Sequence, residues 1–244
     1  MGEYVRRRLA LFLPTLIGMT ILSFALGFAS PSDPALVVLT MDGTSAPTME
    51  ELTAKRRELG LDQPYAVQYV KWLGGVVRGD WGVSFISGKG VLEELFTALP
   101  VTLVVASLAF FWAFLFSIFL GTVMAVYKYR WADRLLLLFS MALTSLPGFW
   151  LAIVAMQLLC EEWHIFPTSG YGSLRHLFLP SAVLAAGTIG AVMRLERDAL
   201  GEVLEKNYIL TARAKGLPFF YVVCKHALKN SLLPIVTMLG NYFG

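Results

Sequence analysis

The residue types that carry out chemistry in proteins are sparse in this sequence. His164 and His176 lie twelve residues apart around a Pro-Thr-Ser-Gly-Tyr-Gly turn, which is not a metal-ligand spacing. Cys160 and Cys224 are far apart along the chain, so they indicate neither a metal site nor a disulfide framework. The sequence contains no Gly-x-x-x-x-Gly-Lys-Ser/Thr segment for ATP. We therefore expect no catalytic residue, no metal site and no cofactor bound by this chain.

The most informative residues lie in a basic, patterned segment, 194–230. A helix with an apolar stripe at Leu195, Ala199, Val203 and Leu204 is predicted to run on through 208–215. It is expected to end at Gly216, with Pro218 just beyond it. A second short segment, 219–226, is aromatic and basic. Two short helices separated by a glycine break suit the docking of a partner. The alternative is an amphipathic hairpin that touches only lipid headgroups.

A proline interrupts one of the apolar parts of the chain. Pro147 removes a helix hydrogen bond and is expected to kink its helix. Thr144 and Ser145 can satisfy the carbonyls that it frees. Such a kink is either a moving part of a transport pathway or fixed packing. In the first case the candidate pathway residues are Ser145, Pro147 and Trp150.

Five stretches without a charged residue or histidine must position these segments. They sum to 107 of the 244 residues and cover 9–29, 99–127, 135–160, 177–193 and 231–244. About 20 apolar residues cross a bilayer as a helix, so we expect an all-α membrane protein with five spans. A chain that is 57% hydrophobic and 15% charged is not a soluble enzyme, a nucleic-acid-binding domain or a disordered protein.

The last of these stretches has only 14 residues. A helix that ends within the hydrocarbon core leaves its last carbonyls unsatisfied. We therefore expect that the chain is truncated or is a fragment, and that the missing part completes the fifth span.

The charges between the stretches orient the chain. The N-terminus, the loop 128–134 and the segment 194–230 together carry a net charge of +7, whereas 30–98 and 161–176 together carry −4. Because cytoplasmic loops are enriched in Lys and Arg, the N-terminus and the segment 194–230 are predicted to face the cytoplasm.

The long outer segment is predicted to form helices of its own. Thr48 and Glu51 have the spacing of a capping box, and a second helix is expected to begin at Asp62. That helix places Tyr69 and Trp72 on one face. Such a face suits packing or the membrane interface, and a binding face for sugar or peptide rings is the alternative.

The five apolar stretches contain no charged residue and no histidine. Proton- and ion-coupled carriers use such residues at depth, and the sequence also lacks the internal repeat that many carriers show. These two features argue against a secondary carrier, and a non-transport membrane scaffold is the other alternative. If the protein moves a solute uphill, another subunit must supply the energy.

The segment 194–230 resembles the EAA loop of ABC importer permeases. The similarity lies in Tyr-Ile-Leu-Thr-Ala-Arg-Ala-Lys-Gly-Leu at 208–217 and His-Ala-Leu-Lys-Asn-Ser-Leu-Leu-Pro at 226–234. It is strongest to the branch that imports dipeptides, oligopeptides and nickel. Leu210 occupies the position of the Glu for which the motif is named. Further segments that resemble this branch, in the same order, are 7–9, 14–15, 59–64, 79–84, 99–102 and 145–152.

The resemblance implies the transmembrane domain of a type I ABC importer, with five of its six spans in this chain. The chain would then comprise an N-terminal transmembrane helix (1–30), an extracytoplasmic helical region (31–98) and a permease transmembrane domain (99–244) that contains the cytoplasmic coupling loop 194–230. It would be a multi-pass protein of a bacterial or archaeal cytoplasmic membrane and would form half of the translocation pathway.

The same resemblance implies the partners and the site. The partners are a second homologous permease, two cytoplasmic ATPase subunits that bind ATP and Mg, an extracytoplasmic solute-binding protein and membrane lipid, with no nucleic acid. The substrates expected first are di- or oligopeptides. The alternative is nickel or a metal chelate, because the segment 170–180 is similar to nickel permeases. The ATPase-coupling residues would be Thr211, Ala212, Arg213, Ala214, Lys215, Gly216 and Leu217, in which the small residues allow close seating and the two bases make polar contacts.

Overall fold

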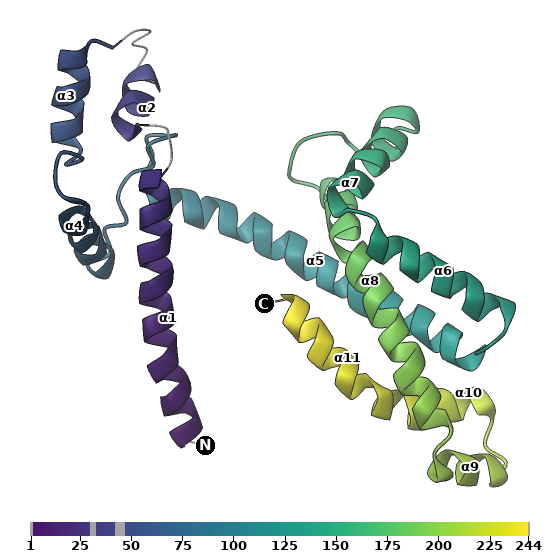
Figure 1. The fold of residues 1–244 in the computed structure, drawn as a ribbon. Helices are drawn as coiled ribbons and strands as arrows, with labels where there is room; N and C mark the ends of the chain where they lie inside the picture. Colours follow the sequence, from purple (N-terminus) through teal and green to yellow (C-terminus); the bar gives the residue numbers. More distant parts are fainter. Residues whose placement is uncertain (1, 30–32, 42–46, 244) are drawn as a thin grey trace. The chain divides into compact units, whose positions relative to one another are not determined.

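The computed structural model describes residues 2–29, 33–41 and 47–243 and is all-α, as the sequence predicts (Figure 1). Within these residues the β-pairing is limited to one isolated bridge, between Val83 and Gly90. The chain divides into two compact units, Met1–Leu99 and Pro100–Gly244. The predicted boundary at 30/31 lies outside the described residues.

In its described residues the first unit contains one long apolar helix, three shorter ones and the start of α5 (Val91–Val126). The four complete helices are α1 (Gly2–Ala29), α2 (Pro34–Met41), α3 (Met49–Glu58) and α4 (Tyr65–Val77). The predicted capping box is present at the start of α3, where the Thr48 hydroxyl accepts a hydrogen bond from the Glu51 N–H at 3.3 Å. The Glu51 carboxylate accepts in return from the Thr48 N–H at 2.8 Å. This bond and that from the Thr48 hydroxyl hold the pKa of the Glu51 carboxyl below its usual range.

Helix α4 begins two residues later than the sequence predicts. Its N-cap is Pro64 and not Asp62. A proline disfavours the helical conformation in the residue before it, which here is Gln63. The helix therefore begins after Gln63.

The aromatic face of α4 packs against α1. The Tyr69 hydroxyl lies 2.9 Å from the Thr20 hydroxyl, and the Phe24 ring lies 5.4 Å from the Tyr69 ring and 6.0 Å from the Trp72 ring. These contacts join two helices within the first unit and confirm the packing role that the spacing predicts.

The second unit is built on three helices whose small residues allow close approach. Its core cluster comprises Ala109 and Ala113 of α5 (Val91–Val126), Ala185 and Val192 of α8 (Leu174–Leu204), and Ile235 and Leu239 of α11 (Leu228–Phe243). Helix α8 also packs against α6 (Trp131–Ser145) and α7 (Gly148–Met156). The remaining elements are the π-helix η1 (Gln157–Glu162), α9 (Asn207–Ala214), α10 (Phe219–Val222) and the π-helix η2 (Val223–Ala227).

Three of the described helices are long and apolar enough to cross a membrane: Val5–Gly27 of α1, Val91–Val126 and Leu174–Leu204. The pair formed by α6 and the continuous α7–η1 segment makes a fourth if it is one bent span. The fifth predicted stretch lies in α11, which has 16 residues. Residue 244 lies outside the described residues.

The predicted kink at Pro147 is a complete break of the helix. Helix α6 ends at Ser145, Leu146 is extended with φ −78° and ψ 130°, and Pro147 becomes the N-cap of α7. The two parts bend by 102°. The prediction of one kinked helix is wrong because the residue before a proline is pushed out of the helical conformation. The Thr144 hydroxyl donates to Ser140 O at 3.0 Å, a carbonyl within α6 and not the one at residue 143 that Pro147 leaves without a donor.

The segment 194–230 also differs from expectation at its start. Residues 194–204 are a continuation of α8, so the charges that the sequence places in a loop lie on the end of a long helix. The sequence predicts that this helix continues to residue 208 and beyond, but it is interrupted at Glu205 and Lys206. Lys206 is extended, with ψ 145°, and is the N-cap of α9.

Candidate coupling site

Helix α9 is a separate short helix that lies between the extended Lys206 and Gly216. Its last turn closes through the Gly216 N–H, which donates to Arg213 O at 2.9 Å, and the Leu217 N–H, which donates to Ala212 O at 3.4 Å. Gly216 has φ +82°, a conformation that glycine adopts without the strain a Cβ would cause. Pro218 then caps α10. The predicted helix and its glycine stop are therefore confirmed.

One side of α9 is anchored to the rest of the second unit. Ile209 is 1% exposed and belongs to an apolar group, here called the junction cluster, that joins five elements. The half-buried Ala212 packs against it. The members of the junction cluster are Ala125 of α5, Leu200 of α8, Ile209 of α9, Val222 of α10 and Ala227 of η2.

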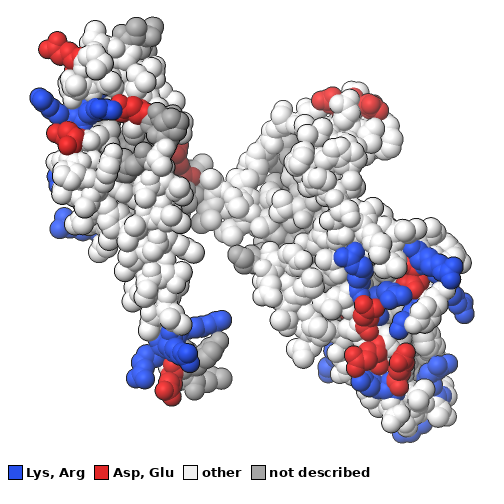
Figure 2. Space-filling model, in the orientation of Figure 1, with Lys and Arg blue, Asp and Glu red and all other residues white. Residues whose placement is uncertain are grey.

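The other side of α9 is exposed. Of the predicted coupling residues, Ala212 alone is turned partly inward, and the exposed ones are Thr211, Arg213, Ala214, Lys215, Gly216 and Leu217. The Arg213 guanidinium lies 5.4 Å from the centre of the Phe219 ring, a cation–π contact that links α9 to α10. Figure 2 shows Lys and Arg side chains gathered, with acidic ones among them, at the end of the second unit where α9 lies.

Two polar contacts hold the start of α9. The Asn230 amide donates to the Tyr208 hydroxyl at 3.0 Å and so ties α9 to α11. Lys206 donates to Glu202 at 2.7 Å, a hydrogen bond that raises the pKa of the Lys206 ammonium above its usual range. The start of α9 is thus tied to the last turn of α8 and to the first turn of α11.

A buried ion pair connects α8 to α6. The Arg197 guanidinium binds both carboxylate oxygens of Asp133, at 2.6 and 2.8 Å, and Asp133 also accepts from the Tyr129 N–H at 2.9 Å. Asp133 is 3% exposed. This two-point geometry fixes orientation as well as distance. The sequence places both residues among the loop charges, and it gives no sign of the pair.

A second buried carboxylate lies one residue before Arg197. Glu196 is 0% exposed, and its Oε1 accepts from the Ser231 hydroxyl at 2.9 Å, which joins α8 to α11. Its Oε2 has no hydrogen-bond partner among the described residues. On the α5 side it faces Gly121, where a Cβ would lie 2.6 Å from the Glu196 Cβ. No sequence pattern singles out this residue either.

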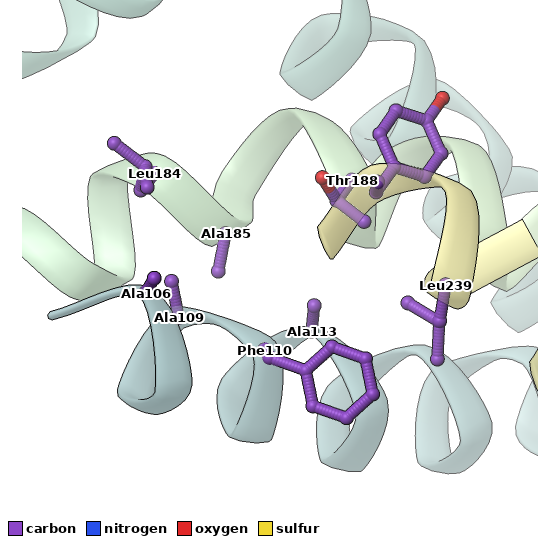
Figure 3. A pocket seen from close by; sticks show the side chains of 9 residues that line it. Ala106, Ala109, Phe110, Ala113, Leu184, Ala185, Thr188 and Leu239 are labelled. Carbon is purple, nitrogen blue, oxygen red and sulfur yellow. The ribbon is translucent and has the colours of Figure 1, made fainter. Parts of the chain in front are cut away.

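The candidate pathway residues lie at the break between α6 and α7. Ser145 and Pro147 are exposed, and Trp150 is 45% exposed. They do not line the cavity of about 100 Å³ that lies among α5, α8 and α11 (Figure 3). That cavity is smaller than the roughly 300–1,000 Å³ of typical ligand sites, so it indicates close helix packing and not a solute site. Its walls include Ala106, Ala109 and Ala113 of α5 and Ala185 and Thr188 of α8.

Two family models match the chain. Residues 1–109 match the N-terminal model of the binding-protein-dependent transport system membrane component, and residues 117–244 match the binding-protein-dependent transport system inner membrane component. The chain belongs to this family. It is the permease subunit of an ABC importer, a multi-pass protein of the bacterial inner membrane, and such subunits are distinct from the ATPases. The family resemblance that the sequence predicts is confirmed.

Similar proteins include permeases with a named substrate. The glutathione transport system permease protein GsiC of Salmonella paratyphi A is 35% identical over 244 residues, which is 100% of this chain and 78% of that protein. The GsiC protein of Salmonella typhimurium is also 35% identical, and that of Escherichia coli (strain K12) is 34% identical, with the same coverage.

Proposed function

We propose that this permease forms half of a translocation pathway for small peptides or peptide-like solutes, and that α9 receives the motion of the ATPase subunits. The observation that supports the coupling role is that the two sides of α9 differ. One side is anchored through Ile209 in the junction cluster, and the other side presents exposed basic and small residues.

The contacts around α9 support a route for the motion. A push on the exposed side of α9 reaches α8 through Ile209 and Leu200, which share the junction cluster. Helix α8 then acts on α6 through the Arg197–Asp133 ion pair and on α11 through Glu196 and Ser231. Displacement at one short helix would therefore reposition several membrane helices together.

The proposed complex contains a second homologous permease, two ATPase subunits that bind ATP and Mg, and an extracytoplasmic binding protein. Membership in a binding-protein-dependent family supports this composition. The glutathione permeases among the similar proteins favour a peptide-like substrate. Nickel or a metal chelate is the alternative.

The coupling role is tested at Gly216. Replacement by valine places a β-branched side chain at φ +82°, which should distort the end of α9 and reduce both uptake and co-purification with the ATPase subunits by about tenfold. Both are measured in membranes from cells that express the complete importer.

Gly60 is the matched control for this test. It has φ +69° and lies outside α9, and as at Gly216 a Cβ added there would meet no atom within 4 Å. Gly60→Val should leave ATPase co-purification unchanged. Normal docking and uptake in Gly216→Val would refute the assignment of α9.

The substrate is tested by uptake in a strain that lacks this permease. Labelled glutathione and dipeptides should accumulate at least about tenfold less than in the parent strain, because half of the proposed pathway is missing and the energy barrier of the bilayer to polar solutes is restored. Nickel uptake should be unchanged. Loss of nickel uptake with normal peptide uptake would establish the alternative.

A further inference from the structure

The first unit contains a large cavity beside the last two turns of α1. Its volume is about 860 Å³, within the range of sites that hold small organic molecules. Helix α1 contributes Thr20, Ser23, Phe24 and Gly27, whose spacing places them on one face of the helix. The rest of the lining comes from the start of α2, from α3 and α4 and the residues between them, and from Phe85.

Charged groups of both signs line this cavity. The Asp33 carboxylate binds the Arg56 guanidinium at 2.7 Å, and the Lys71 ammonium donates to the Gln63 side chain at 2.7 Å. Arginine has five N–H donors and lysine three, more than these contacts use. The cavity therefore offers one carboxylate and two cations, with the aromatic ring of Trp72 in its wall.

The position of the cavity along α1 defines its surroundings. Residues 5–27 of α1 form a candidate membrane span, and the cavity adjoins the end of that span opposite its arginine-rich start. Residues 9–19 are apolar apart from Thr15, and their side chains are not buried by the rest of the first unit, so an apolar surface of this unit leads along the helix toward the cavity. A wall formed by the last turns of a span lies at the level of the lipid headgroups, where Trp is also favoured.

We propose that this cavity binds the headgroup of a membrane phospholipid that carries both a phosphate and an ammonium, as phosphatidylethanolamine does. The phosphate binds Arg56 and Lys71, and the ammonium binds Asp33. The acyl chains follow the exposed apolar side of α1. The Asp33 carboxylate is paired with Arg56, so a phosphate that takes Arg56 must break or share this ion pair. The ammonium of a dipolar headgroup can then replace Arg56 at Asp33, whereas a headgroup with negative charge alone would leave Asp33 without a cation, so the dipolar headgroup is the better match. A water-soluble peptide would bury little apolar area against α1 and would gain little from contact with it.

The test measures the lipid that stays bound to the complete importer after purification in detergent, by mass spectrometry. The double variant Arg56→Gln, Lys71→Gln should retain about tenfold less phosphatidylethanolamine per complex, because two charge-assisted contacts are lost. Ser23→Phe should give a similar loss by filling the cavity from α1 without changing its charge. The control is Arg57→Gln, since Arg57 is exposed and does not line the cavity.

Several outcomes would overturn the proposal. One is unchanged phosphatidylethanolamine in both the double variant and Ser23→Phe, with the complexes intact by size-exclusion chromatography. Another is that the purified importer retains as much phosphatidylglycerol as phosphatidylethanolamine, which would show that the cavity does not discriminate between headgroups by their charge. Displacement of the bound lipid by added glutathione would assign the cavity to a peptide instead.

Discussion

Replacing Gly121 by alanine should destabilise the second unit by about 3 kcal/mol and lower its melting temperature by about 5–10 °C. A Cβ at this position would lie 2.6 Å from the Glu196 Cβ and 2.7 Å from Met193 O. The second of these atoms belongs to the backbone, so it cannot move aside like the tip of a flexible side chain. Helices α5 and α8 would have to separate. The measurement is thermal unfolding of the purified permease complex.

Gly240→Ala is the matched control for this substitution. Gly240 lies in α11, and a Cβ there would meet no atom within 4 Å. Alanine is a better helix former than glycine by about 1 kcal/mol, so this variant should be as stable as the parent protein or slightly more stable. Equal melting temperatures for Gly121→Ala and the parent would show that α5 and α8 do not require this close approach.

The parts of the fold that the sequence predicts correctly depend on local patterns. The capping box of Thr48 and Glu51 involves residues three apart, and the end of α9 depends on Gly216 and its neighbours. Apolar stretches likewise reveal spans because each must satisfy its own backbone within the membrane. None of these features needs knowledge of a distant part of the chain.

The parts that the sequence does not predict depend on distant contacts. Asp133 and Arg197 are 64 residues apart, and nothing near either residue indicates its partner. Charge patterning places Glu196 in a loop, because charged residues commonly mark the ends of spans. The structure shows that α8 continues beyond its apolar stretch, so some of the charges on its last turns become buried against other helices.

The break at Pro147 could be anticipated only in part. Proline predicts the loss of a hydrogen bond, but many proline-containing helices continue, as α5 does through Pro100 and α8 does through Pro180. What differs at Pro147 is that Leu146 is extended. Every proline disfavours the helical conformation in the residue before it, so this local effect does not tell Pro147 from Pro100 and Pro180. Helix α7, which follows the break, packs against α8, a contact that no local pattern predicts.

Removing one partner of the Asp133–Arg197 pair should have the largest effect on stability. Asp133→Ala leaves the Arg197 guanidinium in a site where its side chain is 17% exposed, with the exposed Asp198 carboxylate at 2.9 Å as its remaining ion-pair partner among the described residues. Breaking a buried pair costs about 3–5 kcal/mol, and α6 would lose this polar link to α8. We expect little properly assembled importer and a loss of uptake greater than about tenfold.

Replacing both Asp133 and Arg197 by apolar residues removes the two charges but keeps a contact between α6 and α8. The double variant Asp133→Leu, Arg197→Met has no unpaired buried charge at this site, so its thermal stability should recover to within about 1–2 kcal/mol of the parent protein. The exposed pair Glu202–Lys206 provides a control, because Glu202→Gln should change stability by no more than about 0.5 kcal/mol.

Uptake by the double variant then decides what the ion pair contributes. An apolar contact restores packing, but it lacks the two-point geometry that holds α6 to α8 at a fixed angle. If α8 moves α6 through this pair, the double variant should be stable and should hydrolyse ATP with its ATPase partners, yet import solute poorly. Full recovery of uptake together with stability would show that the pair only holds the helices together and that the motion of α9 reaches the pathway by another route.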